Sequence, residues 1–389
     1  MLDVLFWMAI GIVFYAFLGY GLVLFILVKA KNAFSSPRDR HEPEEWPRVS
    51  LVIPCFNEAD IMKSKATNSL SLEYPDSKCE VVFITDGSTD NFREALAEFP
   101  KVKILHEDRR AGKTAAENRA MEEIDTPIVV FTDANTLLNK MALKNIVRHF
   151  SDAQVGCVSG EKRVLIEEVD SASSAGEGMY WKYESFLKKL DSMLYSAVGA
   201  AGELVAFRSS LYQPLPEDTI LDDFMQSMLI ASAGYRIVYE PEAYAMESGS
   251  DSTGEELKRK IRISAGGWQS MKRLTSKITP FKQPLLFFQY FSHRVLRWTV
   301  TPFLLVFIFI ANLFLWDQGW VYQVVMVGQF FFYLAAALGY VLENRKLRIK
   351  VLFVPYYFCL MNYAVIAGLI RFLKGSQKST WEKAKRRQA

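Results

Sequence analysis

The fold is decided by the stretch Glu80-Val81-Val82-Phe83-Ile84-Thr85-Asp86 and by a second stretch of the same kind, Ile128-Val129-Val130-Phe131-Thr132-Asp133. Each is a short run rich in β-branched and aromatic residues that ends on an aspartate, which is typical of a strand buried on both faces. Similar runs lie at Val49–Ile53, Val102–His106 and Val155–Ser159. Together these runs predict a set of buried strands.

Helical patterns fill the segments between the strands, at Glu58–Leu70, Asn91–Phe99, Ala111–Ile124 and Lys140–Phe150. Alternation of strand and helix predicts an α/β fold with a doubly wound, mostly parallel sheet, whose ligands bind at the carboxyl ends of the strands. Because Asp86 and Asp133 follow two such strands, we expect both carboxylates to face one crevice. The sequence has neither GxGxxG nor GxxxxGK[ST], which argues against a dinucleotide-binding domain and a P-loop.

Composition allows one substantial soluble domain plus membrane segments, because half of the 389 residues are hydrophobic. A formal net charge of +3 gives no support for nucleic-acid binding. The four cysteines show no metal-ligand spacing, and we interpret them as free thiols; three of them lie in the middle of the chain, which fits a cytoplasmic domain there. They are Cys55, Cys79, Cys157 and Cys359.

The N-terminal segment Val4–Val28 has 25 residues without a charged side chain, which predicts a transmembrane helix. A signal peptide is the alternative, but the run lacks a basic start and a small-residue cleavage site. Lys29 and Lys31 follow at once. By the positive-inside rule they place the polar middle of the chain in the cytoplasm and the N-terminus outside.

Three more apolar runs lie near the C-terminus, at Thr299–Trp316, Trp320–Leu342 and Val351–Ile370, and predict two or three further spans. If the last run crosses, the basic tail ends outside, against the positive-inside rule; a re-entrant run is the alternative. Ahead of these runs, Pro284–Trp298 mixes apolar residues with His293, Arg294 and Arg297, which is typical of a helix in the headgroup region.

The predicted organisation is a transmembrane helix at 1–31, a cytoplasmic domain at 32–280, an interfacial helix at 281–298, two to three transmembrane helices at 299–373 and a basic tail at 374–389. We therefore expect an integral protein of the cell's inner or plasma membrane, with the lipid bilayer as one partner.

Two polar motifs follow the deciding strands. Asp86 opens a turn that ends at Asp90 and suits contact with a nucleoside edge, although an ordinary polar turn has the same composition. Asp133 and Asn135 lie two residues apart, so their oxygens suit a shared hard cation such as Mg²⁺ or Mn²⁺. A helix N-cap is the alternative there.

Three further segments carry charges suited to catalysis. Lys113 follows a glycine at a predicted helix start and suits a phosphate, or is part of a solvated turn. Asp222 and Asp223 lie among apolar residues, where burial and mutual repulsion raise one pKa towards that of a useful base; surface carboxylate pairs are the alternative. The basic segment Lys258–Arg262 suits either lipid headgroups or a diphosphate.

Taken in order, these segments resemble the inverting family 2 glycosyltransferases, the group of cellulose, hyaluronan, chitin and poly-N-acetylglucosamine synthases. The resemblance covers about Val49–Trp268. It rests on the segments Val52–Glu58, Asp86–Asp90, Gly112–Asn118, Thr132–Asn135, Ser159–Glu161, Gly199–Arg208 and Asp222–Asp223.

The resemblance implies a GT-A-like fold and a role for each matching position. Asp223 is the expected catalytic base, with Asp222 beside it, and Asp133 and Asn135 are the expected metal ligands. The expected nucleotide-binding residues are Pro54, Asn57, Glu58, Asp86, Lys113, Arg259 and Arg262. The expected acceptor and sugar contacts are Gly202, Glu203, Asp222 and Trp268.

Three positions depart from the family pattern. Arg259 and Ile263 replace the glutamine and tryptophan of a Gln-x-x-Arg-Trp segment, in which Arg262 takes the arginine position. Asn135 stands where the metal motif more often has aspartate, which weakens cation binding.

The implied activity is metal-dependent transfer from a UDP-sugar donor to a carbohydrate or lipid-linked acceptor, extending a β-linked polysaccharide. The alternatives are transfer of one sugar to a membrane acceptor and a catalytically dead membrane sensor. Neither the sugar nor a secretion partner is identified by the sequence.

Overall fold

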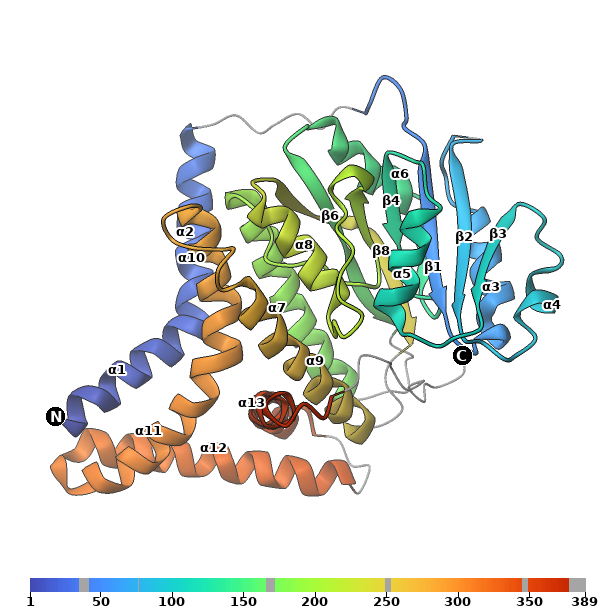
Figure 1. Ribbon diagram of the computed structural model, residues 1–389. Helices are drawn as coiled ribbons and strands as arrows, with labels where there is room; N and C mark the ends of the chain where they lie inside the picture. The colour runs from blue at the N-terminus through green and yellow to red at the C-terminus, as the bar shows by residue number, and fades with distance from the viewer. Residues whose placement is uncertain (35–41, 76, 166–171, 249–252, 345–348, 378–389) are drawn as a thin grey trace.

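The computed structural model describes residues 1–34, 42–75, 77–165, 172–248, 253–344 and 349–377. These residues form a sheet covered by helices, with a lobe of long apolar helices beside it (Figure 1). Most of the basic segment Arg345–Lys350 and most of the basic tail lie outside the described residues.

The sheet contains eight strands in the order β3-β2-β1-β4-β7-β6-β8-β5. Strands β1 to β4 are all parallel, β7 is antiparallel to both of its neighbours, and β6 and β8 are parallel. This confirms the mostly parallel α/β prediction. The strand bounds are β1 Val49–Cys55, β2 Cys79–Asp86, β3 Val102–Glu107, β4 Ile128–Phe131, β5 Leu137–Leu138, β6 Val155–Leu165, β7 Val205–Arg208 and β8 Arg236–Ser248.

All five predicted strands are present, whereas β5, β7 and β8 were not predicted. The first two are only two and four residues long, too short for a periodic pattern. Every residue of β1 is buried, which explains its continuous apolar run.

Helices cover both faces of the sheet. Val52 and Val82 face α5 and α8, whereas Ile53 and Phe83 face α3 and α4, because successive strand residues point to opposite sides. The helices of this domain are α3 Ala59–Leu70, α4 Phe92–Leu96, α5 Lys113–Glu122, α6 Ala142–Val147, α7 Ala172–Leu194, α8 Asp222–Ser232 and α9 Thr253–Leu274.

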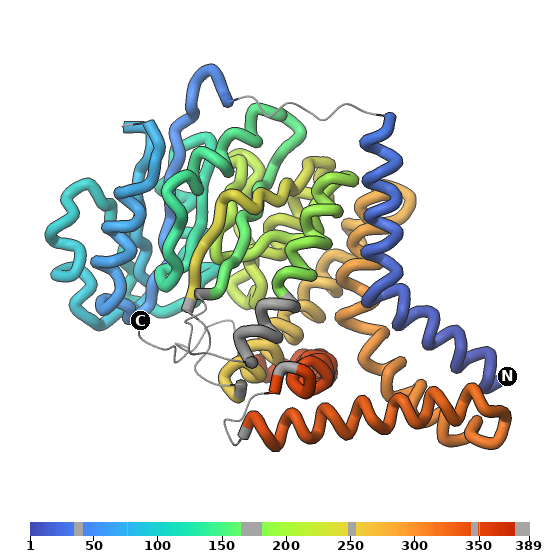
Figure 2. The backbone as a smooth tube through the Cα atoms, turned by 180° about the vertical axis from the view of Figure 1, so that it is seen from behind, coloured from blue at the N-terminus to red at the C-terminus, as the bar shows by residue number. Residues whose placement is uncertain are grey.

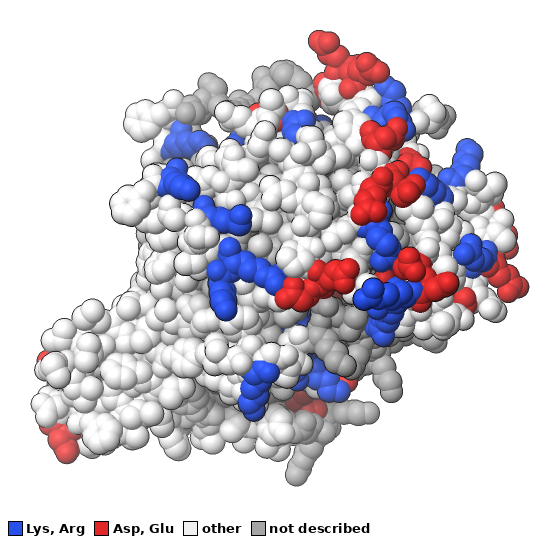
Figure 3. Space-filling model, viewed as in Figure 1, with Lys and Arg blue, Asp and Glu red and all other residues white. Residues whose placement is uncertain are grey.

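Four helical segments among the described residues are long and apolar enough to cross a membrane, namely Leu2–Phe34, Pro284–Gln318, Trp320–Glu343 and Val351–Leu373. The first joins α1 Leu2–Phe14 and α2 Tyr20–Phe34 through a π-helical turn, and the second joins α10 Pro284–Tyr290 and α11 Thr301–Leu315 in the same way. The others are α12 Trp320–Asn344 and α13 Lys350–Leu373. The tube view shows the same lobe from behind (Figure 2), and its visible face carries few charges (Figure 3).

The segment expected to lie among headgroups instead packs inside the protein. His293 is 0% exposed, and its two ring nitrogens lie 2.6 Å from Asp191 and 2.7 Å from Glu184. Arg294 and Arg297 are also buried, at 2.8 and 3.3 Å from Glu184. The polar side chains that suggested a headgroup helix therefore face two carboxylates of α7 inside the protein and join the candidate membrane helices to the sheet domain, and the interfacial position of this segment stays a prediction.

Candidate active site

The loops after β1 and β2 are tied to each other at the carboxyl edge of the sheet. Asn57 Oδ1 accepts a hydrogen bond from the Thr89 amide at 2.8 Å, and the Asn57 amide donates to Ser88 Oγ at 3.1 Å. Pro54 lies within β1, opposite Ile84 of β2. Glu58 immediately precedes α3. Four predicted nucleotide-binding residues, counting Asp86, thus lie at neighbouring strand ends, and their contact with a nucleotide stays a prediction.

Asp86 is buried, with 1% of its surface exposed, and its carboxylate is already hydrogen-bonded. The amides of Ala111 and Gly112 donate to Oδ2 at 3.1 and 2.6 Å, and Arg119 donates to Oδ1 at 3.2 Å. Gly112 has φ +106°, a conformation that favours glycine. Asp86 therefore holds the loop that leads into Lys113, a role that the sequence did not suggest.

Lys113 lies at the centre of a group of carboxylates. Its Nζ atom is 2.7 Å from Asp133, 3.7 Å from Asp222 and 3.8 Å from Glu117. Burial opposes the charge of Lys113, but these carboxylates outweigh it and raise the pKa well above its ordinary value. A Cβ atom at Gly202 would lie 3.2 Å from both Lys113 Nζ and Asp223 Oδ2, so a larger residue here would require one of these two side chains to shift.

The predicted catalytic base lies at the first turn of α8. Burial and the neighbouring charge of Asp222 raise the pKa of Asp223 to about 7, although Lys113 and a 2.7 Å hydrogen bond from the Phe224 amide oppose the shift. Burial lowers the pKa of Arg262 while Asp222, Asp223 and Asp133 act to raise it, so this arginine lies among the same carboxylates. A carboxylate titrating near neutrality suits general-base catalysis.

The two predicted metal ligands are oriented by different partners. Asp133 has 31% of its side chain exposed and pairs with Lys113. Asn135 Nδ2 donates to Glu247 Oε1 at 3.2 Å, which leaves the amide oxygen of Asn135 pointing away from Glu247. Glu247 in turn pairs with Lys162, and with Arg259 at 3.8 Å.

The described residues contain no group of three or more His, Cys, Asp or Glu side chains arranged to hold a metal ion. The oxygens of Asp133 and Asn135 are hard ligands that fit Mg²⁺ or Mn²⁺. Such ions commonly take one or two protein oxygens and complete their coordination with substrate phosphates and water. The donor set therefore fits a cation that arrives with a diphosphate.

The remaining predicted residues lie beside this centre. Lys162 pairs with Glu203 at 2.7 Å and, against the effect of burial, holds the pKa of Glu203 below its ordinary value. Arg259 lies 3.8 Å from Glu247 and 3.3 Å from Glu256. Its carboxylate partners therefore differ from the aspartates that surround Arg262. Trp268 packs against the sheet core, and its buried indole N–H has no hydrogen-bond partner among the described residues.

Two buried charged residues beside the candidate site were not predicted from the sequence. Lys65 is buried beneath the Asp133 turn and donates to Thr132 Oγ1 at 3.0 Å and to the Thr136 carbonyl at 2.7 Å. Burial lowers its pKa to about 7. Glu117 is hydrogen-bonded to Asp222, and burial raises its pKa well above its ordinary value. The sequence signal that could have identified them is a charged residue on the buried face of a helix, Lys65 in α3 and Glu117 in α5.

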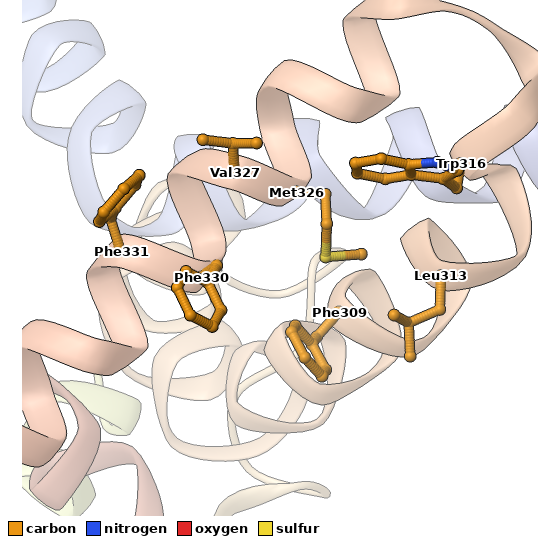
Figure 4. Close-up of a pocket in the computed structure, with 7 residues that line it drawn as sticks. All are labelled: Phe309, Leu313, Trp316, Met326, Val327, Phe330 and Phe331. Carbon is orange, nitrogen blue, oxygen red and sulfur yellow. The ribbon is translucent and has the colours of Figure 1, made fainter.

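An apolar cavity of about 350 Å³ lies between α11 and α12 (Figure 4). Its lining has no charged group, so this cavity is not the site of the chemistry. The lining residues are Phe309, Leu313, Trp316, Met326, Val327, Phe330 and Phe331.

Residues 50–213, which carry β1 to β7 and the Asp86 and Asp133 motifs, match the model of the family "Glycosyl transferase family 2". The chain carries a glycosyl transferase family 2 domain. It is also similar to poly-beta-1,6-N-acetyl-D-glucosamine synthases: that of Staphylococcus epidermidis RP62A is 25% identical over 65% of this chain and 62% of its own. The one from Staphylococcus aureus MSSA476 is 27% identical over 63% and 61%. The chain thus matches less than two thirds of the length of these relatives.

A solved structure shares the fold almost completely. The mannosyltransferase PcManGT from Pyrobaculum calidifontis, in complex with GDP-Man and Mn²⁺, superposes with a TM-score of 0.72 and 24% identity over 97% of this chain and 100% of its own. The chain therefore has a mixed, mostly parallel sheet of GT-A type, with long apolar helices before and after it.

Proposed function

We propose that this family 2 glycosyltransferase is a membrane-embedded inverting enzyme that takes its sugar from a UDP-sugar donor and extends a β-linked polysaccharide at the cytoplasmic face of the membrane. The observation that carries the proposal is the position of Asp223. Its carboxyl has a pKa of about 7 and lies beside Asp222 and Lys113 at the carboxyl edge of the sheet.

In this proposal Asp223 removes the proton from the acceptor hydroxyl. The oxygen attacks the anomeric carbon as the bond from that carbon to the diphosphate breaks, so the configuration inverts. Lys113 and Arg262 both interact with this carboxylate group, and their positive charges are suited to stabilising the negative charge that develops on the departing diphosphate. Mg²⁺ or Mn²⁺ held by Asp133 and Asn135 would neutralise further charge on that group.

Polymer formation is supported by the similarity to the poly-beta-1,6-N-acetyl-D-glucosamine synthases. A second candidate, transfer of one sugar to a lipid-linked acceptor, is favoured by the packing beside the base. Phe224, the residue after Asp223, packs against Trp298 in a tilted arrangement with ring centroids 5.5 Å apart. Trp298 belongs to the candidate span Pro284–Gln318, so the acceptor side adjoins the apolar helices.

Purified protein in lipid, incubated with radiolabelled UDP-Glc, UDP-GlcNAc, UDP-GlcA and UDP-Gal and with Mg²⁺ or Mn²⁺, tests both candidates. A GDP-Man arm tests the nucleotide. A product of high molecular weight supports the polymer, whereas a lipid carrying one sugar supports the second candidate.

Asp223→Asn is the matched control, because the amide keeps the shape of the side chain and cannot accept the proton. We expect this variant to lose transfer with every donor. Unchanged transfer and donor hydrolysis in the variant would contradict the proposed base and favour the sensor alternative.

A further inference from the structure

The last apolar helix, α13, lies against the sheet domain over much of its length. Phe353 and Leu360 belong to a cluster that packs on Leu257 near the start of α9. Fifteen residues after Phe353, a Cβ atom at Gly368 would lie 2.5 Å from Ser264 Cβ and 2.8 Å from the Ala265 amide nitrogen. At 1.5 Å per residue, these contacts span roughly 22 Å of α13.

Helix α9 is a polar part of the sheet domain. Arg273 near its end pairs with Asp218 at 2.7 Å, and Arg262 at its middle lies among the carboxylates of the candidate active site. The stretch Lys258–Arg262 carries four basic residues. A charged side chain at the centre of a bilayer costs about 2.5–3.5 kcal/mol on insertion scales. If α13 crossed the hydrocarbon, it would draw α9 and these charges in with it.

The direction of α13 also differs from that of its neighbour. Both backbone views show α13 end-on, whereas α12 runs lengthwise across the view (Figures 1 and 2). Spanning helices tilt by about 20° on average from the bilayer normal. Helix α13 therefore does not share the direction of α12, as two neighbouring spanning helices commonly do.

The distribution of basic residues supports the same arrangement. Basic residues flank α13 on both sides, in Arg345–Lys350 and in the tail after Leu373. With four spans these two segments lie on opposite sides of the membrane, but with three spans both lie on the cytoplasmic side, as the positive-inside rule requires. The basic residues of the tail are Lys374, Lys378, Lys383, Lys385, Arg386 and Arg387.

We propose that α13 does not cross the bilayer but lies along its cytoplasmic surface, between the lipid and α9, and that Leu2–Phe34, Pro284–Gln318 and Trp320–Glu343 are the crossing segments. The lipid surface is the partner of its outward side, where large apolar side chains remain exposed. These are Val351, Val354, Tyr363, Ile370 and Leu373. The inference does not depend on the sugar, the nucleotide or the reaction.

Single-cysteine labelling with a membrane-impermeant maleimide tests this topology in a variant whose native cysteines are replaced by serine. Gln318→Cys reports the loop between α11 and α12, Ser376→Cys reports the end of α13, and Ser151→Cys reports the sheet domain; all three positions are exposed. We expect Ser376→Cys to label from the same side as Ser151→Cys and from the opposite side to Gln318→Cys. Labelling of Ser376→Cys from the side of Gln318→Cys would overturn the proposal.

A second test keeps the native cysteines. Tyr363 and Phe331 lie near the midpoints of α13 and α12, with 58% and 62% of their surface exposed. A lysine at the surface of the bilayer extends its ammonium into water, whereas one at the centre does not reach it. We expect Tyr363→Lys to keep the wild-type yield and melting temperature in membranes, and Phe331→Lys to lose yield several-fold. Equal losses in both variants would show that α13 crosses.

Discussion

The ionisation of Asp223 makes the most direct prediction. With a pKa of about 7, its carboxyl is about 10% ionised at pH 6 and about 90% at pH 8. If Asp223 is the base, kcat/KM should therefore rise about tenfold between these pH values, since only the ionised form accepts the proton. The assay is the initial rate of nucleotide release at limiting donor and saturating metal ion and acceptor.

Two variants test whether the midpoint belongs to Asp223. Asp222 raises the pKa of Asp223 and Lys113 lowers it. Asp222→Asn should therefore move the midpoint of the pH profile down by about 1 unit or more, and Lys113→Met should move it up. Each profile is normalised to its own maximum, because both variants also lower the absolute rate.

The carboxyl group of Asp223 also makes the stability of the folded protein depend on pH. The folded state binds the Asp223 proton more tightly than the unfolded chain, whose pKa is 3.8. The contribution to stability is therefore present below pH 3.8 and is lost as the pH rises through about 7. Asp223→Asn should raise the free energy of unfolding at pH 8 by up to roughly 4 kcal/mol, and the melting temperature should rise with it. A wild-type kcat/KM that changes less than twofold between pH 6 and 8 would refute the assignment of Asp223 as the base. A pH–rate profile of Asp222→Asn with an unshifted midpoint would refute it as well.

Three further predictions concern the metal site and the link to the membrane helices. Asn135→Asp should tighten Mn²⁺ binding measured calorimetrically with UDP, because it adds a second carboxylate ligand beside Asp133; unchanged or weaker binding by the variant would contradict the assignment of position 135 as a metal ligand. Asp133→Ala should abolish the metal dependence of UDP affinity without changing the circular dichroism spectrum; equal affinity with and without metal in the wild type would count against the assignment. Glu184→Gln leaves the buried Arg294 and Arg297 without their shared carboxylate and should cost about 3–5 kcal/mol in thermal unfolding, whereas Glu255→Gln, from an exposed pair, should cost less than about 1 kcal/mol.

Some features of this protein follow from the sequence alone because they depend on local patterns. The stretches that end at Asp86 and Asp133 each contain four consecutive apolar residues, since parallel strands are buried on both faces, and this pattern predicted that both carboxylates lie at one edge of the sheet. The long apolar runs likewise indicated the membrane helices, because no water-exposed helix has 25 uncharged residues in succession.

Other features were decided only by tertiary structure, because a charge does not show in the sequence which partner it meets. Lys113 and Asp222 are far apart in the chain yet lie 3.7 Å apart, and Arg259 and Arg262, one helical turn apart, serve different carboxylates. The segment around His293 has the composition of a helix in the headgroup region, but the His293 side chain is buried between Glu184 and Asp191. Local hydrophobic patterns determine strands and helices, whereas the pairing of charges depends on how those elements pack.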